Sequence, residues 1–435
     1  MLATTTLPSA IDEIGGLNLI SWAFALYLLG SIIAASAISL AVASLGLRRS
    51  FLLAAFSYAI GCAICALAPS MEILLFARIV QGLGGGALMA LVFISQDRFF
   101  PNHFIPRLVA CMSVTWSVSA FCGPLIGGAF ATAGMWRMAF WLFFGQAIIL
   151  VIAIHFMMRE PIPEKHLETQ KLPIIRLVFL ALSILSISAA GAYFELVRSA
   201  GLIVLGVAFL ALFLLRDRRA GSNRMFPLDT INLAHPIGAG IAMAFCLSMS
   251  IMSFLVYGPL ILINLYGLSP LASGFVVVVE SIAWGCAAVI FSGVSLSREA
   301  SLIRIGSTLV LAGLILMAIF FPQGPLWWIV ICSTVSGSGF GMMWGFVVRR
   351  IADASPKDER DRVSSLIPTV QQLGFALGAA LSGLFANGLG LSETILDDEF
   401  REITFWLFAG FTPLAIIGMG LAWRFTRPRP LLSDG

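Results

Sequence analysis

The sequence predicts an all-α integral membrane protein, and three observations support this fold class. Hydrophobic residues make up 59% of the 435 residues and charged residues only 11%, against about 25% charged in a typical soluble domain. Apolar runs near the 20-residue length of a spanning helix recur along the whole chain. Basic residues gather in alternate loops between these runs. We therefore expect a bundle of helices that crosses a lipid bilayer many times.

The apolar runs predict 13 full spans and a partial first span. The partial span extends from Met1 to Ile11 and ends at Asp12 and Glu13. Ten helical residues cover about 15 Å, which is about half the hydrocarbon core. The full spans are expected at residues 22–44, 51–68, 72–95, 108–133, 136–157, 173–193, 199–215, 235–264, 269–294, 303–321, 326–348, 363–387 and 404–424.

The basic residues predict the orientation of the chain. If the loop with Asp12 and Glu13 faces outwards and later loops alternate, 22 of the 26 Lys and Arg residues fall on the inner side. Loops on the cytoplasmic side of a membrane carry such an excess. We therefore expect a multi-pass protein of the cell (cytoplasmic) membrane with a cytoplasmic carboxy terminus. The net charge of +4 reflects this placement and does not indicate a nucleic-acid partner.

A glycine pattern in the fourth span, "VQGLGGGALMA", recurs in the twelfth as "VSGSGFGMMWG" at an offset of 255 residues. The matched residues are Gly82, Gly84, Gly86, Gly337, Gly339 and Gly341. Two similarly oriented halves are typical of transporters with a substrate site near the membrane midplane. The predicted organisation is an N-terminal helix bundle (1–158, spans 1–6), an inserted helix pair with basic inner loops (159–230, spans 7–8) and a C-terminal bundle (231–435, spans 9–14).

Several stretches resemble motifs of a known family. "FARIVQGLGGGALMA" resembles the span 4 signature of the major facilitator superfamily, "WSVSAFCGPLIGGAFATAG" its span 5 antiporter motif, and "MWRMAFW" the start of span 6. "SWAFALYLLGSIIAASAISLAVASLGLRRSFLL" resembles span 2 and the basic turn after it. Fourteen spans resemble the drug:proton antiporter branch. The resemblance implies a major facilitator fold, with two six-helix halves and two inserted helices, and a secondary active transporter that exports hydrophobic or cationic drugs in exchange for protons by alternating access.

The antiporter motif consists of Gly123, Pro124, Gly127 and Gly128. Glycines let helices approach closely, and a proline bends its helix and frees a backbone carbonyl. The resemblance implies that this helix controls leakage and rocking, whereas tight packing alone would also explain the glycines. The motif departs from the family at Ser119, where a further glycine is usual.

The turn after the second span matches the family less well. Gly46 falls on the turn glycine, and Arg48 and Arg49 fall within the basic run at the inner face. The acidic residue that the family places three positions before the glycine is Ala43 here. An acid–arginine latch at this turn is therefore not expected.

Arg78 lies about two turns into the fourth span, with Gln81 at i+3 on the same face. An unpaired guanidinium at that depth costs a few kcal/mol, so the side chain should face a partner inside the protein. The family signature has an arginine here followed by Gln-Gly, which Gln81 and Gly82 match. The resemblance implies a role in proton coupling and transport. The alternative is an anchor that reaches the outer surface, about 9 Å away.

Glu280 is the carboxylate expected within a span, in "GFVVVVESIAWG". Burial disfavours the charged form of a carboxyl, which suits a group that takes up and releases protons. The alternative is a hydrogen bond that only packs two helices. The family reserves no acid here, so this hypothesis rests on the residue alone.

Other polar and aromatic residues in the spans are weaker candidates. Tyr27, Trp116, Gln371 and Gln372 could line the translocation path, although such residues usually pack helices. Cys62 and Cys65 form a CxxC without a second pair or a nearby histidine, so they are expected to pack. We expect no metal, no cofactor and no enzyme activity. Four histidines near inner loops or helix ends form no HExxH, and no GxxxxGK[ST] sequence is present.

The expected partners are a small-molecule substrate, protons and the bilayer, for a monomeric transport unit. The alternatives are an exporter of a specific endogenous metabolite or siderophore, and a truncated, uncoupled protein. "MLATTTLPSA" aligns with the tail of the family's span 1 motif, in which an acid precedes the position of Met1. We therefore expect the true start, and that acid, to lie upstream.

Overall fold

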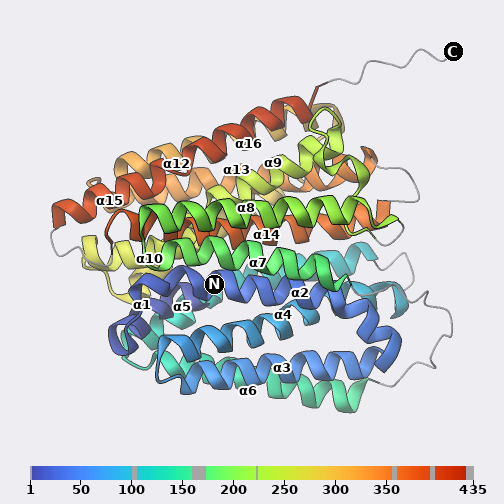
Figure 1. Cartoon of the computed structure of the whole chain (residues 1–435), viewed down its shortest axis with the longest axis horizontal. Coiled ribbons are helices and arrows are strands. Elements are labelled where there is room, and N and C mark those ends of the chain that lie inside the picture. Colours follow the sequence, from blue (N-terminus) through green and yellow to red (C-terminus); the bar gives the residue numbers. More distant parts are fainter. Residues whose placement is uncertain are drawn as a thin grey trace. The chain divides into compact units, whose positions relative to one another are not determined.

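The computed structural model describes residues 2–99, 105–158, 173–221, 224–354, 360–391 and 397–427, and every regular element in these ranges is a helix (Figure 1). The order is α1 (Leu2–Ile14), η1 (Leu17–Leu19), α2 (Ile20–Leu45), α3 (Leu47–Leu67), α4 (Met71–Phe99), α5 (Ile105–Thr132), α6 (Trp136–Met157), α7 (Ile174–Ala192), α8 (Leu196–Arg218), η4 (Leu228–Ile231), α9 (Pro236–Ser250), α10 (Met252–Tyr266), α11 (Pro270–Phe291), η5 (Leu296–Arg298), α12 (Glu299–Phe320), α13 (Leu326–Ala354), α14 (Arg360–Gly388), α15 (Asp397–Ala409) and α16 (Thr412–Phe425).

Among the described residues, twelve helical segments are long and apolar enough to cross a membrane. They include every predicted full span except 108–133, where α5 contributes a shorter apolar segment, Val118–Thr132. The chain is thus an all-helical, multi-pass membrane protein.

Two predicted spans are interrupted helices rather than continuous ones. The span at 404–424 is divided into α15 and α16, because Pro413 lies in the first turn of α16 and cannot continue a preceding helix. The span at 235–264 is divided into α9 and α10 at Ile251. Next to this break the Ser250 hydroxyl donates to the Leu247 carbonyl at 2.8 Å, a local bond that competes with the helical pattern.

The chain forms two compact units. Unit 1 comprises Met1–Arg224, Met252–Val278 and Phe375–Ile403, and unit 2 comprises Met225–Ile251, Val279–Gly374 and Thr404–Gly435. Unit 1 therefore contains α1 to α8 together with α10, the start of α11, the end of α14 and the start of α15. The boundaries fall inside three helices, so parts of one helix take part in different units.

Unit 1 is built around α4, which packs against α2 and α3. Glycines let the backbones of these helices touch. A Cβ added at Gly82 would collide with the carbonyl of Tyr27, and one added at Gly86 would collide with the backbone of Ser31. Figure 1 shows α2 and α4 side by side, with α3 next to α6.

Unit 2 repeats this arrangement with α13 at its centre. A Cβ at Gly337 would collide with the carbonyl of Glu280 on α11, and one at Gly341 would collide with that of Trp284. A Cβ at Gly339 would lie 2.6 Å from the carbonyl oxygen of Gly306 on α12. The glycines matched in the sequence therefore make the same kind of contact in both units.

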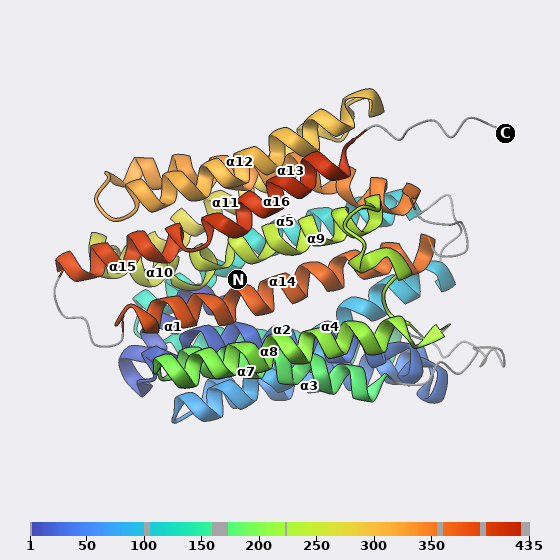
Figure 2. The same ribbon diagram turned by 45° about the horizontal axis from the view of Figure 1, so that its top comes forward.

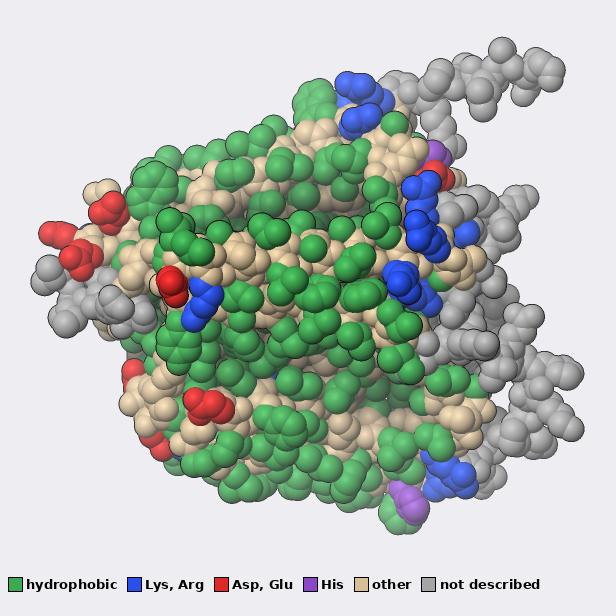
Figure 3. Space-filling model, viewed as in Figure 1, with side chains coloured by type: hydrophobic (Ala, Val, Ile, Leu, Met, Phe, Trp, Pro, Cys, Tyr) green, Lys and Arg blue, Asp and Glu red, His purple; other side chains and the backbone are tan. Residues whose placement is uncertain are grey.

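The helices α7 and α8, which the sequence predicts to be an inserted pair, form an antiparallel hairpin within unit 1 (Figure 2). On the face shown in Figure 3, hydrophobic side chains cover these helices, and charged side chains lie towards their ends. Val204 in the middle of α8 is 68% exposed, for example. A surface of this kind suits contact with lipid tails. At the end of the hairpin away from the α7–α8 connection, Arg176 and Asp217 form a buried ion pair between α7 and α8.

Candidate functional site

Arg78 lies in the core of unit 1 and is only 7% exposed. Its Nε donates to the carbonyl oxygen of Ala23 at 3.0 Å, and its Nη1 donates to Oε1 of Gln81. Its Cζ lies 4.4 Å from the ring centroid of Tyr27, a cation–π distance. Among the described residues these partners are uncharged, so a fixed positive charge is held inside the bundle without a carboxylate.

Gln81 extends these contacts to a third helix. Its Nε2 donates to Sγ of Cys62 at 3.1 Å. The backbone of Gln81 also lies directly against Gly61, where a Cβ would not fit. The residues Ala23, Tyr27, Cys62, Arg78 and Gln81, hereafter the Arg78 cluster, thus connect α2, α3 and α4. The spacing of Arg78 and Gln81 predicted that these two residues lie together. No pattern in the sequence predicted that Cys62 contacts Gln81.

Glu280 is the corresponding polar residue of unit 2 and is 5% exposed. The hydroxyl of Ser336 donates to its Oε1 at 3.2 Å. One turn further along α11, Trp284 stacks on Phe340 of α13, with ring centroids 4.9 Å apart. Glu280 therefore sits at a close α11–α13 contact, between a hydroxyl and an aromatic pair.

Three carboxylates are buried among the described residues, which is more than the sequence indicated. Asp217 pairs with Arg176, and Glu299 pairs with Arg350, both near helix ends. Of these three buried carboxylates, only Glu280 has no basic partner among the described residues. It is therefore the buried acid whose charge is not already compensated by an ion pair.

Tyr27 and Glu280 occupy equivalent positions in the two units. Each contributes the carbonyl that packs on a matched glycine, Gly82 in the first unit and Gly337 in the second. The residue before each glycine also completes the polar contact. Gln81 holds the Arg78 guanidinium over Tyr27, and Ser336 holds the Glu280 carboxyl.

The antiporter-motif residues lie where α5 approaches α1 and α11. The carbonyl of Pro124 accepts a hydrogen bond from Thr5 Oγ1 at 3.0 Å and lies 2.8 Å from the position of a Cβ on Gly274. A Cβ on Gly128 would lie 2.7 Å from Cα of Leu271. Gly123 and Gly127 are buried as well. The motif therefore permits backbone contacts that larger side chains would prevent.

The turn that the sequence places at the inner face is a tight connection between α2 and α3. Gly46 has a φ of +83°, a conformation that glycine adopts readily. Arg48 Nη2 donates to the carbonyl oxygen of His155 on α6 at 2.6 Å, while Arg49 is exposed. Ala43, at the position where the family has an acid, is exposed and offers no carboxylate to Arg48. The turn is instead joined to α6 by the hydrogen bond from Arg48 to His155.

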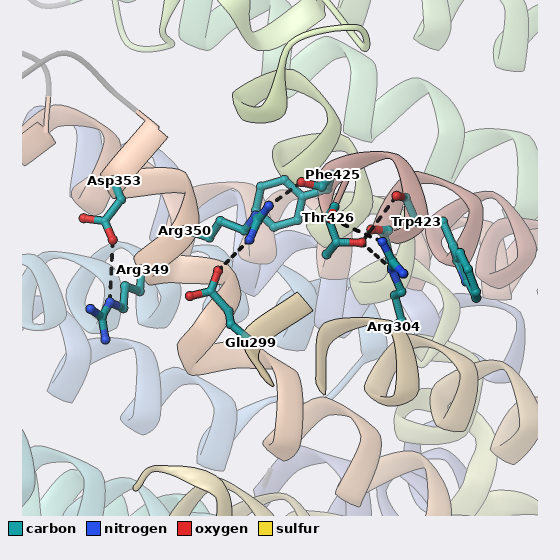
Figure 4. Close-up of polar contacts among 9 residues, drawn as sticks. Glu299, Arg304, Arg349, Arg350, Asp353, Trp423, Phe425 and Thr426 are labelled. Atoms are coloured by element: carbon teal, nitrogen blue, oxygen red, sulfur yellow. Dashed lines mark hydrogen bonds and ion pairs between the residues drawn. The ribbon is translucent and has the colours of Figure 1, made fainter. Parts of the chain in front are cut away.

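A second polar cluster, which sequence reasoning missed, joins the ends of three helices of unit 2 (Figure 4). Arg350 Nη1 pairs with Oε1 of Glu299 at 3.1 Å, and its Nε donates to the carbonyl oxygen of Phe425 at 3.3 Å. Arg304 Nε donates to Oγ1 of Thr426 at 2.7 Å. These contacts hold α12, α13 and α16 together. The predicted span at 303–321 already contains Arg304, but α12 begins four residues earlier at Glu299, where an acid in the first turn favours the helix.

The remaining candidate residues belong neither to the Arg78 cluster nor to the contact of Glu280 with Ser336. Gln371 and Gln372 are half-buried on α14. The side chain of Trp116 lies outside the described residues. Within the described ranges, no group of three His, Cys, Asp or Glu residues could hold a metal ion.

Comparison with known proteins decides the family. The model of the Major Facilitator Superfamily matches residues 1–348 and 302–434. The chain belongs to this superfamily. It is 29% identical over 440 residues to a probable multidrug-efflux transporter of Mycobacterium tuberculosis, covering 98% of this chain and 90% of that protein. It is 24% identical over 403 residues to the multidrug efflux pump SdrM of Staphylococcus aureus, covering 90% and 87%.

A solved structure of a D-xylose–proton symporter has the same fold, with a TM-score of 0.65 and 14% sequence identity over 98% of this chain and 95% of that one. A major facilitator protein with these relatives is a membrane transporter of small molecules and not an enzyme.

Proposed function

We propose that this major facilitator protein exports hydrophobic or cationic compounds from the cell in exchange for protons. The observation that carries the proposal is Glu280, a carboxyl that is 5% exposed, has no basic partner among the described residues and is held by the Ser336 hydroxyl. A buried acid that gains and loses a proton is the group that proton coupling needs. The multidrug-efflux names of two relatives support the substrate class.

The proposed topology follows the charge distribution. The basic loops face the cytoplasm together with the carboxy terminus, and the ends of the helices near Glu13 and Asn387 face outwards. The chain has two six-helix halves, 1–158 and 231–435, and an inserted pair within 159–230, with 13 full spans and a partial first span. One chain forms the transport unit in the cytoplasmic membrane.

The proposed mechanism uses the two polar sites in different ways. The Arg78 cluster holds a fixed charge. The guanidinium is hydrogen-bonded to the Ala23 carbonyl and to Gln81 and lies over the ring of Tyr27, and these groups are uncharged. Glu280 changes its charge. Charging a buried carboxyl is costly, so its deprotonation favours a state in which water reaches it. Proton binding and release at Glu280 therefore bias the alternation between the two access states, and the substrate travels in the opposite direction.

The close contacts of α5 would limit leakage during this alternation. Gly128 brings α5 against the start of α11 without intervening side chains. A helix seam of this kind can rock while it excludes water, whereas bulky side chains would wedge it open. The Pro124 carbonyl extends the same seam, because it lies 2.8 Å from the position of a Cβ on Gly274 of α11.

The test is accumulation of ethidium in cells with and without the chain, at two external pH values and with an uncoupler. We expect lower accumulation in cells that carry the chain, a larger effect at the lower external pH, and loss of the effect with the uncoupler. Efflux that persists after the proton gradient is abolished would overturn the coupling. A panel of lipophilic cations without any effect would instead favour export of a specific metabolite.

A further inference from the structure

The end of α7 makes contacts that its place in an inserted hairpin does not require. The last four carbonyls of a helix have no donors within it. Three of those of α7 receive donors from other segments. One donor, the Ser199 hydroxyl, comes from α8 of the same hairpin and reaches the Ala190 oxygen at 2.7 Å. The other two come from outside the hairpin: Nδ2 of Asn387 donates to the Gly191 oxygen at 2.7 Å, and Nδ2 of Asn18 donates to the Ala192 oxygen at 2.9 Å. Asn18 belongs to η1 and Asn387 to α14, so segments from opposite ends of the chain share one helix terminus.

Asn387 also connects these two segments directly. Its Nδ2 donates to the carbonyl oxygen of Asn18 at 2.8 Å as well as to that of Gly191. A turn earlier on α7, the Ser188 carbonyl accepts a hydrogen bond from Trp22 Nε1 at 3.0 Å. Asn387 is 8% exposed, and its bond to the Gly191 carbonyl is buried.

Close backbone packing surrounds the bonds. A Cβ on Gly191 would lie 2.6 Å from the amide nitrogen of Leu384, and one on Gly388 would lie 3.1 Å from the ring of Phe194. A Cβ on Gly383 would collide with the Ser21 side chain. The hairpin, α2 and α14 are therefore in contact with one another at this end of unit 1.

We propose that Asn18, Asn387 and the end of α7 form a latch that holds the outer end of the transporter closed, which makes the inserted pair a working part of the transport cycle. The inference rests on the outward orientation and the alternating access of the proposed function. Opening this end requires α14 to leave α2, and that movement breaks the bonds from Asn387. The bonds from Asn387 to the Gly191 and Asn18 carbonyls must then be exchanged for bonds to water, a cost that favours closure.

The test uses Ser21→Cys as a reporter, because Ser21 is 2% exposed and faces Gly383. Intact cells are treated with a membrane-impermeant maleimide, and the chain without the reporter gives the background of the native cysteines. Asn387→Asp keeps the side-chain shape but replaces the amide donors. We expect it to increase the labelling rate about 5- to 30-fold, the factor for one to two kcal/mol. Asn18→Ala removes fewer contacts and should give a smaller increase.

Two controls separate a latch from general loosening. Asn264→Ala removes an exposed asparagine of α10 and should leave labelling unchanged. Cys65 is fully buried on α3, so its labelling reports unfolding and should stay low in every variant. Equal reporter labelling in Asn387→Asp and Asn264→Ala would overturn the latch, as would a parallel rise at Cys65. The assay contains no drug and no imposed proton gradient, so it decides the latch even if the proposed substrate or coupling ion is wrong.

Discussion

Glu280 of α11 occupies in unit 2 the position that Tyr27 of α2 occupies in unit 1, with its carbonyl on the glycine that matches Gly82. The two units thus share this helix contact but carry different side chains at it. In unit 1 the aromatic ring lies beside the charge of Arg78, whereas in unit 2 the side chain is itself ionisable. This difference predicts that one half is fixed in charge and the other titrates.

The substitution Glu280→Gln should separate efflux from external pH. Glutamine retains an oxygen that can accept the Ser336 hydrogen bond, so the α11–α13 contact should remain, but the amide cannot take up a proton. We expect the variant to lose the increase of ethidium efflux at low external pH. The matched control is Glu195→Gln on the exposed α7–α8 connection, which should behave as the parent chain does. An unchanged pH profile in Glu280→Gln would assign this residue to packing.

Arg78→Ala should abolish efflux without preventing membrane insertion. The change leaves the Ala23 carbonyl and the Gln81 amide without their partner, at a cost of about 1 to 3 kcal/mol, and removes the buried charge. Efflux should fall at least about tenfold, which corresponds to 1.4 kcal/mol. Arg216→Ala, on the exposed end of α8, serves as the control for loss of an arginine. Normal efflux by a well-expressed Arg78→Ala chain would remove Arg78 from the mechanism.

The spans and the helix contacts of the glycine motifs follow from hydropathy and spacing, which are local properties of the sequence. The partners of the buried polar groups do not. Ser336 lies 56 residues from Glu280, and Asn387 lies 369 residues from Asn18, so no local pattern relates them. Arg78 with Gln81 could be predicted because both lie on one helix face.

Boundaries were the weaker part of the sequence prediction for a related reason. Hydropathy does not distinguish a continuous helix from two short ones. A hydropathy pattern also ends a span at the first charged residue. The helix itself can continue past that residue when another side chain compensates the charge. Glu299 is such a case, since Arg350 compensates its charge at the start of α12.

Gly128→Ala should damage transport through packing alone. The added Cβ would lie 2.7 Å from Cα of Leu271, and backbone atoms cannot move aside as the tip of a side chain can. Overpacking of this kind costs about 1 to 3 kcal/mol. Efflux should fall, and the apparent unfolding temperature in detergent should decrease. Gly145→Ala on α6 is the matched control, because a Cβ there would meet nothing within 4 Å. Equal behaviour of the two variants would contradict a close α5–α11 seam.

Two neighbouring arginines of α13 should differ in their effect on stability. Arg350→Ala leaves the buried Glu299 carboxylate unpaired and should destabilise the fold by about 3 kcal/mol. Arg349 pairs with Asp353 at 3.6 Å, with both side chains more than half exposed, so Arg349→Ala should change stability by less than about 1 kcal/mol. Thermal unfolding in detergent measures both. Adding Glu299→Gln to Arg350→Ala should recover part of the loss, and the absence of any recovery would show that the damage lies elsewhere.

The stability of the chain should depend on pH through Glu13. Hydrogen bonds from Arg137 and from Trp136 Nε1, the latter 2.7 Å long, lower the pKa of its carboxyl from the ordinary value of 4.5. A carboxyl whose pKa is lower in the folded chain stabilises the fold above that ordinary value, and the contribution disappears as pH falls through the lowered pKa. Parent and Glu13→Gln chains should therefore differ in unfolding temperature near pH 7 and converge as the solution is acidified. A constant gap between parent and Glu13→Gln at all pH values would contradict the linkage.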